Sequence, residues 1–572
     1  MKDDLPVMQS SGESFLWGKF GTAVLVVFLM SFLYVNRALE MWELWSVDRR
    51  FRARGAEVVS SKVVLVEIAE DSIKEIGRWP WDRRWHAALI RALKAFGART
   101  IAFEPIFSEP SDPASDDALA KVIQDSGNVF FSVKDSQTES RDRGVDAPMP
   151  LLAQAAKGLG HIVSPPDRDG TLRRVSPSVR YGGREFWPLG ILAGADWLGI
   201  RPESIRLEPD RMVIESPERD LIEIPLTQQG DILINWPGSW EEAFRHVSYV
   251  DVVTSYARWR KGEAPRISVD LFKDALCIVG VSATGLCDIR TTPVDPVYPR
   301  VGLEAVLADC VIQNRFLHPV GRVGNLFILW VFGAVLFVLH YRHNFIQTTG
   351  VILVAAAAYY ALSLVLFRSA GIVVTVVYPM ALTLFMHLAL SVFYEVMFAL
   401  EKQRLVRAAT TDGLTGLFNL RHFKALLQRE IEQRILKPGT ELCVAMADVD
   451  SFKEINDEHG HAAGDAILRL MGATLKTVTR GRGAAGRYGG DEFVLMFTGL
   501  PLTEAARVLE SARAEIAGRR GTLGEGSREP ACSASFGVAA FRESDTSDTL
   551  LARADEALYL SKRAGRNRVH CL

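Results

Sequence analysis

The stretch RYGGDEFVLMF, Arg487–Phe497, places two consecutive carboxylates, Asp491 and Glu492, directly after a Gly-Gly pair and before an apolar run. Gly-Gly followed by β-forming residues predicts a hairpin. A solvated hairpin tip would explain the acidic pair as well as a chemical site would. The choice between the two depends on whether other reactive side chains converge on this tip.

A second acidic site follows the apolar run in LCVAMADVDSFKEIND, Leu442–Asp457. The run predicts a buried strand in which Asp448 faces a ligand, while Asp450 turns away or caps the next segment. If the two strands are neighbours, Asp448 converges with Asp491 and Glu492. These carboxylates stay ionised at low cost only if a cation lies between them. Hard oxygen ligands of this kind suit Mg²⁺, which keeps waters and shares substrate phosphates.

Basic side chains near the end of the sequence could complete a phosphate site. Lys562 and Arg566, in SKRAGRNRV, stand about one helical turn apart, which suits the binding of phosphate oxygens. The hairpin glycines would let a phosphate chain approach the backbone closely. A metal ion, a triphosphate and a positioned hydroxyl are the components of phosphoryl or nucleotidyl transfer. The alternative for Lys562 is a solvated helix residue, and His459 and His461 are expected to pack or cap rather than to bind metal.

An α/β domain from about residue 412 onward must position these side chains. DGLTGLFN, Asp412–Asn419, is a turn-rich opening, and 420–435 has the pattern of an amphipathic helix. GHAAGDAILRLMGATL begins a further helix whose apolar face includes Ile467 and Met471. We therefore expect strands that end on carboxylates, with helices packed against the sheet.

Length and composition bound the rest of the molecule. At 572 residues the chain is too long for one domain, and about three or four units are expected. A formal net charge of −2 gives no electrostatic case for nucleic acid as a partner. The six cysteines form no CxxC pair, which disfavours a zinc site and a disulfide scaffold, while pairing among Cys277, Cys287 and Cys310 stays open.

Four apolar stretches approach the ~20 residues that cross ~30 Å of hydrocarbon. They lie at about 15–35, 325–340, 347–367 and 371–394. The first could be a cleaved signal peptide, but no small-x-small cleavage site closes it, and a retained anchor is favoured. His387, inside the last stretch, is expected to form a hydrogen bond to a neighbouring helix rather than to relay protons.

Four crossings would put both ends of the chain on one side of the membrane. Basic residues fall between the second and third spans and after the fourth, at Arg342, His343, Lys402, Arg404 and Arg407. By the positive-inside rule these regions are cytoplasmic, which places the long block between the first and second spans outside.

The block between the first and second spans has the pattern of an α/β domain with a substantial core. VVLVEIA (63–69) and TIAFEPIF (100–107) predict strands, and 85–96 predicts an amphipathic helix. Glu70 and Asp71 follow the first strand and are expected to cap the next helix, with ligand binding as the alternative.

This block also resembles a known family. The segments VDRRFRARG, IAEDSIKEIGRWPWDRRWHAALIRALKAFGARTIAFEPIFSEPS and IVGVSATGLCDIRTTPVDPVYPRVGLEAVLADCVIQNRFL are similar to the second-type CHASE sensor domain, in the family's order. That family typically lies outside the membrane and is followed by three membrane helices. The resemblance implies an extracytoplasmic sensory role toward an unknown ligand, because the family has no well-defined ligand motif to carry over.

The C-terminal domain resembles the GGDEF diguanylate cyclase family. YGGDEF, DGLTGLFN, DVDSFKEINDEHGHAAGD and ADEALYLSKRAGRNRV are similar to that family's motifs in order and spacing. The resemblance implies a palm-like βαββαβ fold and the condensation of two GTP molecules to cyclic di-GMP with release of two pyrophosphates. It also implies Mg²⁺ as cofactor, with Mn²⁺ as a substitute, and a homodimer, because two domains must each present one GTP.

The resemblance assigns roles to matching carboxylates. Asp448 and the carbonyl of Val449 match metal-binding positions. Asp491 matches the position of proton acceptor and metal ligand, and Glu492 stands beside it as a further carboxylate. Asp491 and Glu492 are therefore the expected catalytic residues.

Other matching positions would hold the nucleotide. Asn456 and Asp465 match the pair that reads guanine, since an amide and a carboxylate can pair with the guanine edge; helix capping is the alternative. Three positions match phosphate contacts: Lys453, Lys562 and Arg566. At the family's Arg-x-x-Asp product-inhibition site, Arg480 is present but Gly483 replaces the Asp, so feedback inhibition is expected to be weak or absent.

Together these patterns predict a multidomain protein of the bacterial inner membrane. We expect a cytoplasmic tail, a membrane helix, an extracytoplasmic sensor, three membrane helices, a helical signalling linker and a cytoplasmic cyclase domain, at residues 1–14, 15–36, 37–320, 323–394, 395–411 and 412–572. The expected activity is diguanylate cyclisation, regulated by an external signal through dimer geometry. The alternative is a catalytically silent receptor that binds GTP or cyclic di-GMP and signals by protein contact.

Overall fold

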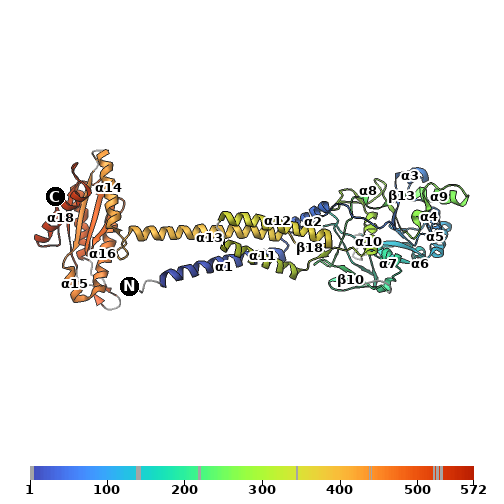
Figure 1. Cartoon of the computed structure of the whole chain (residues 1–572), viewed down its shortest axis with the longest axis horizontal. Helices are drawn as coiled ribbons and strands as arrows, with labels where there is room; N and C mark the ends of the chain where they lie inside the picture. The colour runs from blue at the N-terminus through green and yellow to red at the C-terminus, as the bar shows by residue number, and fades with distance from the viewer. Residues whose placement is uncertain are drawn as a thin grey trace. The chain divides into compact units, whose positions relative to one another are not determined.

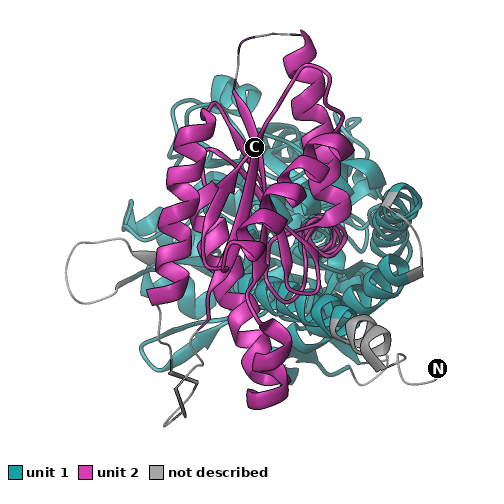
Figure 2. Ribbon diagram, turned by 90° about the vertical axis from the view of Figure 1, so that its left-hand side faces the viewer, with its two compact units in different colours: residues 1–393 teal, residues 394–572 magenta. Residues whose placement is uncertain are grey.

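The computed structural model describes residues 6–136, 144–216, 221–342, 345–436, 439, 441–518, 522–523, 527–528 and 532–572. The chain divides into two compact units, Met1–Phe393 and Tyr394–Leu572 (Figure 2). The boundary between them falls inside one long helix, α13 (Val377–Thr410).

A mostly parallel sheet forms the centre of the sensor region in the first unit, with strand order β13-β1-β14-β2-β3-β4 and with β5 paired to β3. Among these strands only the β3–β4 pair is antiparallel. Runs such as VVLVEI in β1 are almost entirely buried, as expected for parallel strands covered on both faces. The strands are β1 (Val63–Ile68), β2 (Thr100–Phe103), β3 (Val129–Ser136), β4 (Gly144–Asp146), β5 (Gly158–His161), β13 (Arg245–Ser248) and β14 (Leu276–Val281).

Alternate residues of this sheet face two separate cores, with helices on each face (Figure 1). Val64 and Val66 join a cluster with α4, α5 and α9, whereas Val63 and Leu65 join a cluster with α7 and α10. The period of two along a strand produces this division. The helices are α4 (Arg83–Ala95), α5 (Pro113–Ser126), α7 (Leu189–Trp197), α9 (Tyr249–Arg260) and α10 (Val301–Gln313).

Shorter elements complete the sensor region. The helices are α3 (Glu70–Ile76), α6 (Pro150–Ala155), α8 (Trp240–Ala243), and the 3₁₀ turns Pro202–Ser204 and Val269–Phe272. The strands are β6 (Arg174–Val175), β7 (Val179–Tyr181), β8 (Arg184–Phe186), β9 (Ile205–Leu207), β10 (Arg211–Ile214), β11 (Ile222–Pro225), β12 (Ile232–Leu233), β15 (Ile289–Arg290) and β16 (Tyr298–Pro299).

The first strands and helix predicted for this block are present, with one early strand end and capping that is found in part. β2 ends at Phe103, before the predicted residue 107, and Pro105 follows, whose missing N–H cannot extend the ladder. Ala69 precedes α3 without a side-chain cap, but the Asp71 carboxylate accepts from the backbone N–H of Ser72 in the first turn at 2.6 Å. Glu70 instead accepts a hydrogen bond from the backbone N–H of Thr284 at 2.6 Å.

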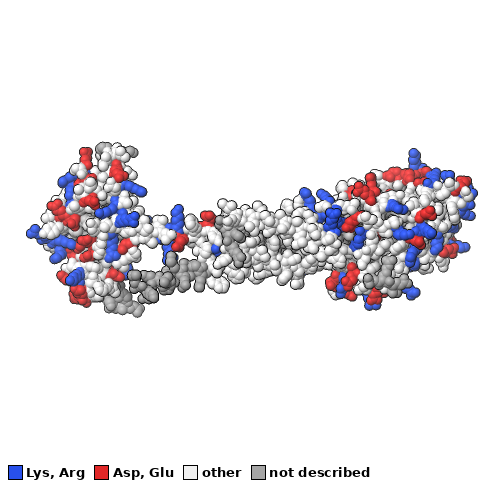
Figure 3. Space-filling view, viewed as in Figure 1, with Lys and Arg blue, Asp and Glu red and all other residues white. Residues whose placement is uncertain are grey.

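Four helices are long and apolar enough to cross a membrane, by length and composition. The candidate spans are Phe15–Val35, Arg322–Tyr341, Ile346–Ala370 and Val377–Thr410. They belong to α1 (Pro6–Val35), α11 (Arg322–Arg342), α12 (Phe345–Ala370) and α13, and a separate helix, α2 (Glu40–Arg54), follows the first. Charged side chains are sparse on the visible surface of the spans and dense on the sensor region (Figure 3).

The last span begins later than the predicted residue 371. Gly371 adopts a left-handed backbone, φ +64°, directly after α12 ends. Ile372–Val373 then forms β18, which pairs in parallel with β17 (His318–Pro319), and α13 starts only at Val377. An apolar run alone cannot distinguish this short strand from helix.

The hydrogen bond predicted for His387 is present. His387 Nδ1 lies 3.1 Å from His340 Nε2 on α11, and its Nε2 lies 3.2 Å from Thr349 Oγ1 on α12. The side chain therefore joins three of the four candidate spans.

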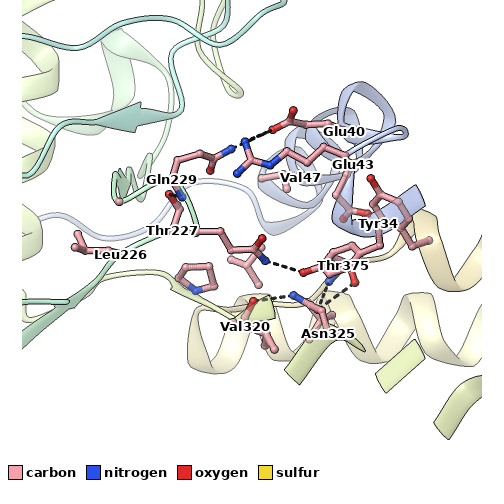
Figure 4. Close-up of a pocket in the computed structure, with 18 of the residues that line it drawn as sticks. Tyr34, Glu40, Glu43, Val47, Leu226, Thr227, Gln229, Val320, Asn325 and Thr375 are labelled. Atoms are coloured by element: carbon pink, nitrogen blue, oxygen red, sulfur yellow. Dashed lines mark hydrogen bonds and ion pairs between the residues drawn. The ribbon is translucent and has the colours of Figure 1, made fainter. Parts of the chain in front are cut away.

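The sensor region meets the ends of the candidate spans around a pocket of about 620 Å³ (Figure 4). The turn 226–230 of the sensor reaches the end of α1 there, because Gln228 Nε2 donates to the hydroxyl of Tyr34 at 2.7 Å. Gln229 Nε2 donates to Glu40 at the start of α2 at 3.2 Å. Glu43 of α2 accepts from the backbone N–H groups of Val376 and Val377, which tie α2 to the start of α13.

The second unit is built on one sheet of strand order β19-β21-β22-β20-β25-β26. Helices α15, α16 and α17 contribute to the core on one face, and α14 and α18 to the core on the other. The main strands are β19 (Phe418–Asn419), β20 (Leu442–Val449), β21 (Gly483–Gly489), β22 (Glu492–Thr498), β25 (Ala534–Ala540) and β26 (Val569–Cys571). A small pair, β23 (Thr522–Leu523) and β24 (Ser527–Arg528), stands apart.

Two helices of this unit, α14 and α16, were expected from the sequence. The helices are α14 (Leu420–Leu436), α15 (Phe452–His459), α16 (His461–Thr479), α17 (Leu502–Gly518) and α18 (Ser547–Arg563). Ile467 and Met471 are buried as predicted. Apart from the small β23–β24 pair, the order from β20 to β25 is strand, two helices, two strands, helix, strand, so a helix pair stands where βαββαβ has a single first helix.

Candidate active site

The two acidic strand ends lie side by side. β20 pairs with β22 in antiparallel register, and Asp448 stands directly across from Glu492. The backbone N–H of Val449 donates to the carbonyl of Asp491 at 3.3 Å. Gly490, with φ +56°, makes the turn between β21 and β22 that the Gly-Gly pair predicts. β20 and β22 are therefore neighbours, as the sequence argument for a shared site requires.

Asp448 is buried and forms an ion pair with a lysine. Lys562 Nζ of α18 lies 2.8 Å from its carboxylate. Burial raises the pKa of Asp448 to about 6, Lys562 opposes this, and the nearby charges of Asp491 and Glu492 raise the pKa further. The charges of Asp491 and Glu492 therefore act on Asp448 from the neighbouring strand end, and a metal site shared by the three carboxylates stays a prediction.

Asp450 turns away from this group. Its carboxylate accepts hydrogen bonds from the hydroxyls of Ser533 and Ser535, each at 2.6 Å, and from the backbone N–H of Asn567 at 3.0 Å. Ser451, in the left-handed region with φ +54°, redirects the chain after β20. Asp450 thus fastens the loop after α18 to the sheet, which is a structural role.

The predicted guanine-reading pair occupies two packed helices. Asn456 lies on α15 and Asp465 on α16. Gly464, which precedes Asp465, packs so close to the side chain of Asn456 that a Cβ at position 464 would collide with it. Glycine at that position is required for Asn456 to lie against α16 beside Asp465. Asp465 is partly exposed, with Arg469 at 3.8 Å.

The remaining predicted contacts are accessible. Lys453 on α15 is exposed. Arg566 follows α18 in a left-handed conformation, φ +61°, and is also exposed. His459 and His461 are exposed as well, and nothing in their surroundings makes them a metal pair.

One positioning pair was missed from the sequence. Arg487 donates from Nε and Nη2 to the carbonyl of Gly490 at 2.9 and 2.6 Å, and from Nη1 to Asp412 at 3.2 Å. Asp412 also accepts from the backbone N–H of Thr415. Arg487 therefore ties the acidic hairpin to the opening turn of the domain. The basic residue before YGGDEF was the available signal.

The donor set fits a hard divalent cation with few protein ligands. Carboxylates of Asp448, Asp491 and Glu492 and the carbonyl of Val449 are oxygen donors of the type Mg²⁺ prefers. Among the described residues no group of three or more His, Cys, Asp and Glu side chains forms a ready-made metal cluster. That agrees with an ion that keeps waters and takes substrate oxygens.

The two residues at the predicted product-inhibition position, Arg480 and Gly483, line a groove in this unit. Arg480 lies exposed at the end of α16 and lines a groove of about 760 Å³ together with Lys476 and Gly483. Gly483, φ +158°, begins β21, and a Cβ there would collide with the backbone carbonyl of Met496. The local backbone therefore favours glycine at position 483, where the family's motif has Asp.

Comparison with known proteins agrees with this geometry. The CHASE2 domain model matches residues 22–340, which is more than half of the chain. The chain belongs to the CHASE2 domain family. This CHASE2 protein also carries a GGDEF domain, since the model described as diguanylate cyclase, GGDEF domain, matches residues 409–568.

Similar proteins match the GGDEF domain of this CHASE2 protein. Diguanylate cyclase DgcP of Pseudomonas aeruginosa is 38% identical over 170 residues, covering 30% of this chain and 25% of that protein. Diguanylate cyclase DosC of Escherichia coli K12 is 40% identical over 158 residues, covering 28% and 34%. Response regulator PleD of Caulobacter vibrioides is 38% identical over 162 residues, covering 28% and 36%. The chain spans about a quarter to a third of the length of these relatives.

A solved structure of the coiled coil and GGDEF domain of DgcB from Caulobacter crescentus, in complex with c-di-GMP, is also similar. Its identity is 33%, and the match covers 33% of this chain and 100% of that chain, with a TM-score of 0.31.

Proposed function

We propose that this CHASE2 protein is a sensory diguanylate cyclase that condenses two GTP molecules to cyclic di-GMP and two pyrophosphates. The observation that carries the proposal is Asp448 standing across from Glu492 and beside Asp491, with Lys562 at its carboxylate. Carboxylates at two adjacent strand ends, with a lysine beside one of them, are groups of the kind that bind metal ions and the phosphates they hold. The relatives named diguanylate cyclases share this domain.

Each predicted residue has a place in the reaction. Asp448, the Val449 carbonyl, Asp491 and Glu492 would hold Mg²⁺, which when bound supplies charge stabilisation for the phosphates. The 3′-hydroxyl of one GTP attacks the α-phosphorus of the other, and pyrophosphate leaves. Asp491 or Glu492 takes or shares the proton of that hydroxyl.

Substrate binding would use the surrounding side chains. Asn456 and Asp465 would pair with the guanine edge, and Lys453 and Arg566 would meet phosphate oxygens. Lys562 would have a second function, because its Nζ lies 2.8 Å from the Asp448 carboxylate and neutralises it. With Mg²⁺ held by the carboxylates, Lys562 would contact a phosphate oxygen instead.

The direct test is turnover by the full chain. Purified protein with Mg²⁺ and labelled GTP should form cyclic di-GMP, and Asp491→Asn should lower the rate at least 100-fold because the proton acceptor and a ligand charge are lost. Asp555→Asn, at an exposed position on α18, is the control and should keep the wild-type rate. Binding of GTP without turnover would instead support a silent receptor, and a single-nucleotide cyclic product would exclude a diguanylate cyclase.

We also propose that the four spans place the sensor outside and the GGDEF domain in the cytoplasm of the bacterial inner membrane, with the domain bounds given from the sequence. Candidate spans and the extracytoplasmic character of CHASE2 support this. An external signal would act on the geometry of two facing GGDEF domains. The second unit has its own cores, so residues 395–572 can be tested alone. Enforced dimers of 395–572 should exceed monomers in product formed; equal rates would contradict this regulation.

A further inference from the structure

A small notch beside the first membrane span gathers three arginines. Its volume is about 270 Å³, and it lies where the corner between α1 and α2 meets the sensor region. Arg37 comes from that corner, and Arg168 and Arg174 come from the sensor. The remaining lining residues are Ala38, Glu40, Met41, Leu44 and Gln229.

Among the residues that line the notch, basic side chains outnumber acidic ones, with three arginines and one carboxylate, Glu40. Arg174 is compensated from outside the lining, because its Nε donates to the Asp167 carboxylate at 2.8 Å and Asp231 lies at 3.9 Å. Arg168 is exposed, and within the described part of the chain no hydrogen bond or ion pair engages it. The one ion pair that Arg37 forms with a described residue reaches Glu40 at 4.0 Å, too far for a hydrogen bond, and its side chain is 38% exposed. Arg37 and Arg168 are therefore available to an anion.

The position of the notch is the edge of the hydrocarbon. Arg37 stands two residues beyond the candidate span that ends at Val35. Trp42 and Trp45, on the adjacent α2, are 63% and 52% exposed. Exposed tryptophans at this point are typical of the interface between acyl chains and headgroups. In Figure 3 basic side chains gather where the apolar surface of the spans gives way to the sensor region.

A separate apolar groove lies on another face of the same helix. Trp42 and Trp45 line it together with Met380 and Leu384 of the last span, and its volume is about 380 Å³. At about 100° per residue these tryptophans point away from Glu40, Met41 and Leu44, which line the notch. The guanidinium of Arg49, which also lines this groove, lies over the ring of Trp45, 4.5 Å from its centroid. α2 therefore has a polar face and an apolar face, as expected for a helix at the membrane interface.

We propose that the arginine notch binds the phosphate of an anionic membrane phospholipid, whose acyl chains lie beside the first candidate span. Arginine pairs with phosphate through two parallel N–H···O bonds, and Arg37 and Arg168 supply those donors. The side chain amide of Gln229 offers a polar contact to the headgroup. The site requires only that the first span lies in the membrane, and it holds whether or not the C-terminal domain is a cyclase.

A lipid phosphate in the notch would alter the contacts between the sensor region and α2. Glu40 and Gln229 line the notch and the 620 Å³ pocket alike, and they join the sensor turn to α2 (Figure 4). A bound phosphate draws Arg37 away from Glu40, which changes the charge next to that hydrogen bond. Lipid composition thereby becomes an input to the sensor.

The test uses the full chain in detergent and native mass spectrometry, with phosphatidylglycerol and phosphatidylcholine as probes. Wild type should retain phosphatidylglycerol in preference, and the double variant Arg37→Gln, Arg168→Gln should lose at least tenfold in affinity. The double variant Arg37→Lys, Arg168→Lys keeps the charges and should retain intermediate binding. Arg91→Gln, at an exposed position on α4 at the end of the sensor away from the spans, is the control and should bind as wild type (Figure 1).

Three outcomes would overturn the proposal. One is equal retention of both lipids by wild type, and another is unchanged retention by the double Gln variant. The third is complete displacement by millimolar inorganic phosphate, which would identify a soluble phosphate site instead of a lipid site. An unchanged elution volume and thermal midpoint of each variant confirm that it is folded.

Discussion

Arg487 shows how one side chain sets the geometry of the acidic hairpin. It bonds the turn carbonyl of Gly490 and the carboxylate of Asp412, two segments 75 residues apart. The hydrogen-bond ladder between β20 and β22 holds the backbone of Asp491 and Glu492 near Asp448. No side-chain contact of Asp491 or Glu492 is needed for this alignment. Arg487 controls the remaining freedom, which is the tilt of the turn.

We therefore expect Arg487→Gln to lower kcat at least tenfold while leaving the fold intact. The amide cannot bridge both partners, and a misplacement of about 1 Å at reacting groups can cost about 100-fold in rate. Hydrogen exchange at Gly489 and Gly490 should accelerate. Arg507→Gln removes an exposed ion pair with Glu504 and serves as the control. Unchanged kcat and unchanged exchange in Arg487→Gln would show that the bridge is incidental.

At the residue scale the sequence identified Asp448, Asp491 and Glu492 because strand alternation and a glycine turn are local signals. The contact of Lys562 with Asp448 joins residues far apart in the chain, and no period in the sequence reports such a contact. The same holds for Arg487 with Asp412. Charge spacing and family resemblance supplied Lys562 only as a phosphate contact, so its pairing with Asp448 came from the structure.

At the scale of elements, α4 carries a buried histidine between the sheet and α9. His86 is fully buried, with Tyr249 Oη 3.0 Å from its Nδ1. Phe107 and Trp79 pack against the ring. Burial, aided by the charge of Arg83, lowers the pKa of His86 to about 3. The helix therefore packs only with a neutral imidazole.

This predicts acid sensitivity of the sensor region. Because the folded-state pKa lies below the unfolded value of about 6.5, the stabilisation is complete above pH 6.5 and is lost as pH falls toward 3. The loss is about 1.4 kcal/mol per pH unit, or about 2 kcal/mol at pH 5. His86→Phe should flatten the fall of the apparent thermal midpoint between pH 7 and 5, followed by tryptophan fluorescence.

The matched variant His318→Gln, at an exposed position, should keep the wild-type slope. If His86→Phe kept that slope too, another group would be responsible. His161 is the first candidate, since burial and the charge of Arg300 also lower its pKa to about 3.

The sequence located the elements with strong apolar patterns but not their ends. Buried strands and amphipathic helices follow from such patterns, so β1, β20, α4 and α16 were expected. The start of α13 at Val377 was not, because the pairing of Ile372–Val373 with His318–Pro319 is a contact between distant segments within an unbroken apolar run. The arginine notch was equally invisible, since its residues come from two separate regions of the chain.

At the scale of the molecule, α2 is anchored in the sensor region by a buried ion network. Arg173 is almost fully buried and donates to both oxygens of Asp48 at 2.7 Å, and to Asp167 and Asp169. Asp48 lies on α2, which follows the first span. A displacement of that span is therefore transmitted to the sensor core rather than absorbed between them.

Asp48→Ala should release this anchor. Removing the sole partner of a buried charge costs about 3–5 kcal/mol, and the cost here should lie below that range because Asp167 and Asp169 still compensate Arg173. Amide exchange across α2 should accelerate, and the apparent midpoint of the sensor should fall. Glu185→Ala removes the exposed pair with Arg180 and should change stability by less than about 1 kcal/mol. Similar small effects of both variants would show that α2 is held by apolar packing alone.

The unbroken course of α13 from Val377 to Thr410 has a rotational consequence. No Gly or Pro follows Pro379 within it, so each inserted residue would turn everything downstream by about 100° and advance it by about 1.5 Å. One alanine added near Glu401 shifts the angular phase strongly, whereas seven bring it back to within about 20°. The rate of cyclic di-GMP formation should then rise and fall with the number of inserted residues, with the period of the helical repeat. A rate that does not change with insertion length would mean that α13 transmits no rotation.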